Sequence, residues 1–159
     1  MMMAYVLKAA GVTDRKMYLY DTFEGMNEPT EVDKSFQGDS AKSQLEKQDK
    51  QKADSVWCYS SLDEVKNNLR STGINEDILV YVKGQVENTL KEGELPDSIS
   101  LLRLDTDWYE STKVELEVLY PLVTKNGAVI IDDFGHWEGA KKAVTEFLDS
   151  LSFIPLIHR

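Results

Sequence analysis

The stretch that decides the fold is Gly127-Ala128-Val129-Ile130-Ile131-Asp132-Asp133. Its apolar part has the length of one β-strand, and an apolar run without polar interruption predicts a strand buried on both faces. Two carboxylates follow at the point where this strand ends. Such strands are typical of parallel sheets that helices cover on both faces.

Strand and helix patterns alternate along the rest of the chain. Residues 153–157 favour an additional strand, with Pro155 at its start or at an edge of the sheet. The alternation predicts an α/β fold with a mainly parallel sheet. Strands are predicted at 16–21, 78–83 and 99–104, and helices at 1–10, 61–73, 86–91, 111–123 and 140–151.

The composition fits a single domain over residues 1–159. Hydrophobic residues make up 42% of the chain, which is enough for a core, and the net charge of −10 disfavours nucleic acid as a partner. No apolar run approaches the roughly 18 residues of a membrane-spanning helix, so no membrane partner is expected. Cys58 is the only cysteine, which excludes an intrachain disulfide and favours a cytoplasmic location.

Residues 30–54 differ in composition from the rest of the chain. Charged side chains crowd this stretch and apolar ones are few. It is therefore predicted to lie outside the core, as a solvated helix, a mobile lid or a disordered loop. Its length favours a lid or functional loop.

Three predicted strands end in acidic residues: Asp21, Asp105 with Asp107, and Asp132 with Asp133. In open α/β sheets, ligands bind beyond the carboxyl ends of the strands. Carboxylates that converge there repel one another unless a cation neutralises them, and an all-oxygen ligand set suits Mg²⁺, Ca²⁺ or Mn²⁺. Asp105, Asp132 and Asp133 are thus candidate metal ligands. The alternative is that each aspartate caps the turn or helix after it.

Two further residues are candidates for chemistry. Asp21 has the position of an acid that binds ribose hydroxyls beside a nucleotide pocket. His136 follows Asp133 closely and is either a proton acceptor or a plain loop histidine. The stretch Asp105-Thr106-Asp107 also matches, loosely, metal-dependent glycosyl and phosphoryl transferases. The chain has no glycine-rich phosphate loop, which disfavours kinases and dehydrogenases.

Several of these stretches together resemble one family. The stretches are YLYDTFEGM at 18–26, LRLDTDWYEST at 102–112 and IIDDFG at 130–135, with YVKG at 81–84 and WEGAKKAV at 137–144 in support. They are similar to the TylF/MycF macrocin O-methyltransferases over most of the chain. The resemblance implies a Rossmann-like methyltransferase fold and Mg²⁺-assisted transfer of a methyl group from S-adenosylmethionine. The acceptor it implies is a sugar hydroxyl of a natural product or glycan.

The resemblance also implies roles for individual residues. The metal ligands would be Asp105, Asp132 and Asp133. Asp105 is the preferred base for the proton of the sugar hydroxyl, with His136 as the alternative. Asp21 would hold the ribose of S-adenosylmethionine, and residues 84–86 would border its adenine. The implied cofactor-binding residues are Asp21, Gly84, Gln85, Val86 and Asp105.

Relative to the family pattern, we expect the first strand with its glycine-rich cofactor turn, and the last strand, to be missing. Two expectations follow: the exposed sheet edge favours a homo-oligomer, and a non-catalytic remnant that serves as an interaction module is an alternative to an active enzyme. A metal-dependent glycosyl or phosphoryl transferase is the third alternative.

Overall fold

The computed structural model describes residues 1–52, 54–153 and 155–157. The chain divides into two compact units, each taken by itself below. The first unit is Met1–Asn27 with Gln48–Gln85, and the second is Glu28–Lys47 with Val86–Arg159. The expectation of one domain over the whole chain stays a prediction.

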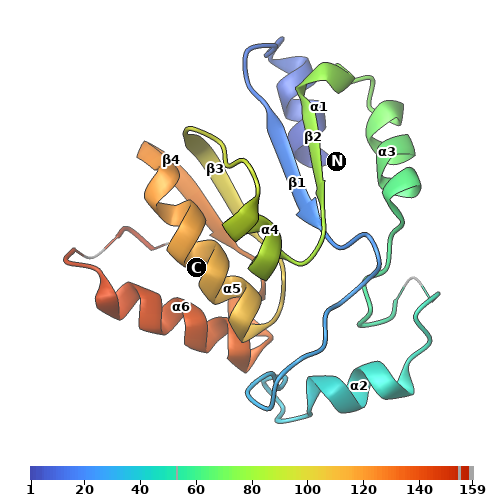
Figure 1. The fold of residues 1–159 in the computed structure, drawn as a ribbon, viewed down its shortest axis with the longest axis vertical. Helices are drawn as coiled ribbons and strands as arrows, with labels where there is room; N and C mark the ends of the chain where they lie inside the picture. Colours follow the sequence, from blue (N-terminus) through green and yellow to red (C-terminus); the bar gives the residue numbers. More distant parts are fainter. Residues whose placement is uncertain (53, 154, 158–159) are drawn as a thin grey trace. The chain divides into compact units, whose positions relative to one another are not determined.

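The first unit is built on two parallel strands, β1 (Met17–Asp21) and β2 (Leu79–Lys83), which pair in register along their whole length. Two helices, α1 (Met2–Ala9) and α3 (Leu62–Ser71), pack against this pair (Figure 1). Ser61, the first residue of the helix predicted at 61–73, is the N-cap of α3, and its hydroxyl accepts a hydrogen bond from the Glu64 N–H. The core consists of Ala4, Met17, Leu69, Ile74 and Ile78.

The second unit is built on the parallel strands β3 (Ile99–Leu104) and β4 (Val123–Ile131). Helix α5 (Tyr109–Leu119) packs on β3 and lies between α4 (Val86–Glu92) and α6 (Glu138–Ser150) (Figure 1). The chain passes from α5 to β4 through a short 3₁₀ turn at Tyr120–Leu122, and a second 3₁₀ turn at Asp133–Gly135 follows β4. The remaining elements are α2 (Ala41–Lys47), α4 (Val86–Glu92), η2 (Tyr120–Leu122), η3 (Asp133–Gly135) and α6 (Glu138–Ser150), with η1 (Glu76–Ile78) in the first unit.

The four principal strands and their following helices confirm the predicted α/β alternation, with one correction at α5. This helix begins at Tyr109 rather than at residue 111, so Ser111 and Thr112 lie inside it and do not cap it. Both are buried, and the Ser111 hydroxyl donates to Glu87 Oε1 at 2.5 Å instead. The segment predicted as helix at 120–123 is a 3₁₀ turn that leads into β4.

The prediction that residues 30–54 lie outside the core is wrong for part of the stretch. Asp33, Ala41 and Leu45 are all buried, the last two on α2. Residues up to Lys47 belong to the second unit and those from Gln48 to the first. A role of this stretch as a lid stays a prediction.

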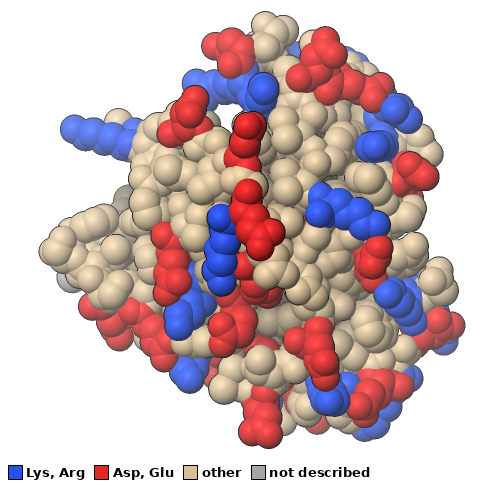
Figure 2. Space-filling model, viewed as in Figure 1, with Lys and Arg blue, Asp and Glu red and all other residues tan. Residues whose placement is uncertain are grey.

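The strand predicted at 153–157 is not present in the described residues of that stretch, and Ile154 lies outside them. Leu156 is instead 89% exposed. Within the part of the chain that the structure describes, no helix is long and apolar enough to cross a membrane. Figure 2 shows acidic side chains interspersed with Lys and Arg on the visible face. Cytoplasmic location and homo-oligomer formation stay predictions.

Candidate functional site

Three carboxylates meet where β3 and β4 end. The parallel register places Leu104 beside Ile131, and the Asp132 N–H donates to the Leu104 carbonyl at 3.0 Å. Beyond this point, Asp105, Asp107 and Asp133 each bring a carboxylate oxygen within 4.8 Å of the others. These three side chains together form the carboxylate group of the second unit. The convergence of strand-end acids predicted from the sequence is therefore present in the second unit.

Burial and neighbouring carboxylates disfavour the ionised forms of Asp105 and Asp107. Burial, followed by the hydrogen bond and repulsion from Asp133, raises the pKa of Asp107 to about 8, while a hydrogen bond from Trp137 acts in the opposite direction. Partial burial also raises the pKa of Asp105. Asp133 Oδ2 is buried and has no hydrogen-bond partner among the described residues. An all-oxygen group with an unpaired buried oxygen fits a hard divalent cation.

Asp132, a predicted metal ligand, lies outside this group of three. Its carboxylate accepts a hydrogen bond from Arg103 Nη2 at 2.6 Å, and Arg103 Nη1 donates to Asp105. The guanidinium therefore bridges Asp105 and Asp132. Asp107, rather than Asp132, is the third residue with a carboxylate oxygen close to those of Asp105 and Asp133. The metal-ligand role of Asp132 stays a prediction.

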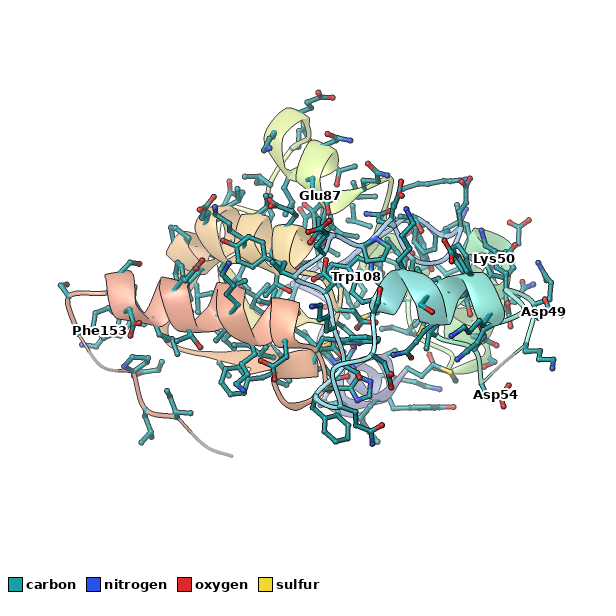
Figure 3. All side chains as sticks on the ribbon, turned by 90° about the horizontal axis from the view of Figure 1, so that it is seen from below. Asp49, Lys50, Asp54, Glu87, Trp108 and Phe153 are labelled. Carbon is teal, nitrogen blue, oxygen red and sulfur yellow. The ribbon has the colours of Figure 1, made fainter. Side chains whose placement is uncertain are left out.

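Two buried tryptophans border the carboxylate group. Trp108, labelled in Figure 3, directly follows Asp107 and packs edge to face against Trp137, with ring centroids 4.9 Å apart. The Trp137 side chain in turn hydrogen-bonds Asp107. These two rings exclude water from one side of the group, which explains why Asp107 is desolvated.

His136, a predicted proton acceptor, is exposed and lies in a short aromatic row. Its ring contacts Trp137 at 4.7 Å and Phe36 at 5.7 Å between centroids. The backbones of the two segments also contact each other: the Phe36 N–H donates to the His136 carbonyl at 2.8 Å, and Ser35 forms a β-bridge with Trp137. The segment before α2 is thus docked beside the carboxylate group. Nothing tests the role of His136 as a base, which stays a prediction.

Asp33 is a functional-site neighbour that the sequence did not single out. Its Oδ1 accepts the Tyr109 N–H at 2.8 Å, and its Oδ2 accepts the Thr30 N–H and hydroxyl at 2.7 and 2.8 Å. Asp33 therefore caps α5 from a position 76 residues earlier in the chain. Gly139 makes room for it, because a Cβ there would lie 1.9 Å from Asp33 Oδ1. A buried acid in a charged stretch gives no local signal of this role.

In the first unit, the structure brings two predicted cofactor residues together. Asp21 ends β1, Gly84 follows β2, and the Gly84 N–H donates to the Asp21 carbonyl at 2.9 Å. Asp21 Oδ1 accepts the Phe23 N–H at 2.6 Å, so the acid does cap its own turn. Gly84 has φ 144°, a backbone conformation that favours glycine.

The other predicted cofactor residues are divided between the units. Gln85 ends the first unit, and Val86 opens α4 in the second unit with its side chain buried. Asp105 lies in the second unit as part of the carboxylate group. The cofactor roles of these three residues stay predictions.

Solved structures of similar fold are methyltransferases. The O-methyltransferase NovP superposes with a TM-score of 0.71 at 30% sequence identity, covering 93% of this chain and 57% of NovP. A calicheamicin methyltransferase superposes with a TM-score of 0.60 at 20% identity, covering 92% of this chain and 59% of that one, and supports the fold alone. The fold is therefore the Rossmann-like α/β fold predicted from the sequence.

Sequence relatives define the family. The model of the macrocin-O-methyltransferase (TylF) family matches residues 1–154, and the chain belongs to this family. It is 32% identical over 146 residues to the demethyldecarbamoylnovobiocin O-methyltransferase of Streptomyces niveus, covering 92% of this chain and 52% of that protein. It is 27% identical over 144 residues to the mycinamicin III 3''-O-methyltransferase of Micromonospora griseorubida, covering 91% and 53%. The chain spans about half the length of these curated relatives.

Proposed function

We propose that this protein is an O-methyltransferase that moves a methyl group from S-adenosylmethionine to a sugar hydroxyl of a natural product, with a divalent cation such as Mg²⁺. Family membership supports the reaction class, and relatives are named as O-methyltransferases of demethyldecarbamoylnovobiocin and mycinamicin III. The observation that carries the proposal is the group of three carboxylate oxygens within 4.8 Å. A bound cation would lower the pKa of a coordinated sugar hydroxyl.

The cation ligands proposed are Asp105, Asp107 and Asp133, with Asp132 as a further ligand. The support is the donor set, which contains only carboxylate oxygens, and the unpaired Asp133 Oδ2. Such ligands suit Mg²⁺ or Mn²⁺ better than zinc. Arg103, which bridges Asp105 and Asp132, would keep these two carboxylates in place.

The proposed cofactor-binding residues begin with Asp21, whose Oδ2 would accept the ribose hydroxyls. The neighbouring Gly84 and Gln85, with Val86, would border the adenine. Support comes from the ends of β1 and β2, where the Gly84 N–H already bonds the Asp21 carbonyl. The sulfonium carries a positive charge that an acidic site attracts.

The base proposed for the hydroxyl proton is Asp107, in preference to Asp105 or His136. Without a cation, the pKa of Asp107 is raised to about 8. A bound cation would lower this pKa and keep the carboxylate ionised at neutral pH, as a general base requires. As the hydroxyl oxygen attacks the methyl carbon, Asp107 would take the proton and the sulfur would keep the electron pair of the broken carbon–sulfur bond. Trp137 would orient the Asp107 carboxylate for this step.

The test is calorimetric titration of S-adenosylmethionine into the chain, followed by incubation with glycosylated natural products and Mg²⁺. We expect saturable binding and a product heavier by one methylene group. Asp107→Asn would retain cofactor binding and lose transfer. A folded chain that binds S-adenosylmethionine but methylates no sugar would favour the non-catalytic alternative and contradict the proposal.

A further inference from the structure

Glu115 is a buried carboxyl group inside α5 that no proposed step uses. The residue is 5% exposed, and its Oε2 accepts a hydrogen bond from the Thr106 hydroxyl at 2.9 Å. Thr106 stands between Asp105 and Asp107 in the chain. This bond therefore ties the interior of α5 to the turn that carries two of the three grouped carboxylates.

We propose that Glu115 is a positioning residue: through Thr106 it holds the turn at residues 105–107 in the shape that groups the carboxylate oxygens. The inference rests on the proposed function in one respect, because it takes the grouped oxygens of Asp105, Asp107 and Asp133 as a cation site. The role assigned to Glu115 is to set the geometry of the site without touching cation or substrate.

The turn needs such support for two reasons. Asp107 has φ 66°, in the left-handed region that residues with a Cβ adopt at a cost. Its carboxyl group also lies close to two others, and ionised carboxylates at this distance repel one another. Within the turn, the Trp108 N–H donates to the Thr106 carbonyl at 2.7 Å. The Thr106 hydroxyl also links the turn to α5 through its hydrogen bond to Glu115.

A carboxyl group suits this position because it is held neutral. Burial raises the pKa of Glu115 to about 8, and the charges of Glu87, Asp105 and Asp133 add to the effect, against the Thr106 hydrogen bond. At neutral pH the group therefore carries its proton for most of the time. It can accept the hydrogen bond of the Thr106 hydroxyl without adding a further negative charge beside the carboxylate group.

The first test measures Mn²⁺ binding to the chain by calorimetry. Thr106→Val and Glu115→Leu each remove the bond, and we expect the dissociation constant to rise about 10-fold, the effect of one hydrogen bond. Glu115→Gln keeps an oxygen acceptor and should stay within about 2-fold of wild type. Combining Thr106→Val with Glu115→Leu should add little to either change, because both remove the same bond.

Thr89→Val is the matched control. It also removes a buried hydroxyl in the second unit, but Thr89 Oγ1 has no hydrogen-bond partner among the described residues. We expect Mn²⁺ affinity to be unchanged. An equal loss in this variant would show a general effect of repacking and overturn the positioning role.

The second test does not depend on a cation. Hydrogen exchange of the amides at 105–109, measured by mass spectrometry without metal, should be faster in Thr106→Val and Glu115→Leu and unchanged in Glu115→Gln. Unchanged exchange in the first two variants overturns the inference. If wild type binds no Mn²⁺, the cation part of the proposed function fails, while the exchange measurement still decides whether Glu115 positions the turn.

Discussion

Strand ends carry carboxylates in both units, but the two places differ in how the acids are satisfied. At the end of β1, Asp21 stands alone and exposed, and one of its oxygens accepts the Phe23 N–H of its own turn. At the ends of β3 and β4, three carboxylates crowd together, and Asp133 keeps a buried oxygen without a partner among the described residues.

This difference shows what a strand-end aspartate can mean. A single exposed carboxylate with one satisfied oxygen is ready to accept hydroxyl groups, as a ribose would require. A crowded, partly buried group is unfavourable until a cation joins it. Under the proposed function, the same residue type at the same place in a βα unit would bind two different ligands, and the neighbouring residues would decide which.

The largest expected effect is that of Gly139→Ala, which attacks the packing behind the carboxylate group. The new Cβ would lie 1.9 Å from Asp33 Oδ1 and 3.1 Å from the Tyr109 nitrogen. Displacing a buried carboxylate from its donors should lower the free energy of unfolding by about 3 kcal/mol, measured by urea denaturation. Gly135→Ala is the control, since nothing lies within 4 Å of a Cβ there. Equal effects at both positions would contradict the role of Asp33.

The second effect separates the two strand ends directly. Asp133→Asn removes the anionic oxygen of the carboxylate group and should weaken Mn²⁺ binding about 100-fold, or about 2.8 kcal/mol, in calorimetry. Asp21→Asn should leave Mn²⁺ binding unchanged. If Asp21→Asn weakened Mn²⁺ binding as much, the assignment of the cation to the second unit would be wrong.

The third effect concerns the strand end in the first unit and the binding of S-adenosylmethionine. Asp21→Asn should weaken S-adenosylmethionine binding about 10-fold, because an amide accepts hydroxyl hydrogen bonds less strongly than a carboxylate. The control is Asp14→Asn, another exposed aspartate of the first unit. Calorimetry of both variants is the measurement, and equal affinities would remove Asp21 from the cofactor site.

The smallest effect concerns pH. In the folded chain the pKa of Glu115 is raised from 4.5 to about 8, so the folded state binds this proton more tightly than the unfolded state. The contribution of Glu115 to the free energy of unfolding is greatest below about pH 4.5 and falls as the pH rises toward about 8. Between pH 6 and 7, the free energy of unfolding of Glu115→Gln should therefore rise by about 1 kcal/mol relative to that of wild type. Urea unfolding at each pH is the measurement. A difference that does not change with pH would contradict the burial of this acid.

Most elements of the fold were predictable because their signals are local. The strand predicted at 78–83 is β2 within one residue, and the helix predicted from residue 61 is α3, with Ser61 as its N-cap. At the start of α5, where the prediction was wrong by two residues, the cause is distant. Helix α5 begins at Tyr109 because Asp33 caps it, and no window around residues 109–112 contains that acid.

The candidate site divides in the same way. Sequence reasoning found Asp21, Asp105 and Asp133 from their places after apolar strands. It included Asp107 among the converging acids but named Asp132, not Asp107, as a metal ligand. Which acids meet depends on the left-handed backbone at Asp107 and on the guanidinium of Arg103. Turn shape and ion pairing are products of packing.

By itself, the sequence determined the α/β alternation, the strand ends at which acids occur and the family to which the chain belongs. The tertiary structure decided which acids meet, which one remains without a donor and which, like Glu115, are held neutral. The physical reason is that apolar periodicity acts over a few neighbouring residues. Burial and hydrogen bonding, which set the charge of an acid, depend on residues far away in the chain.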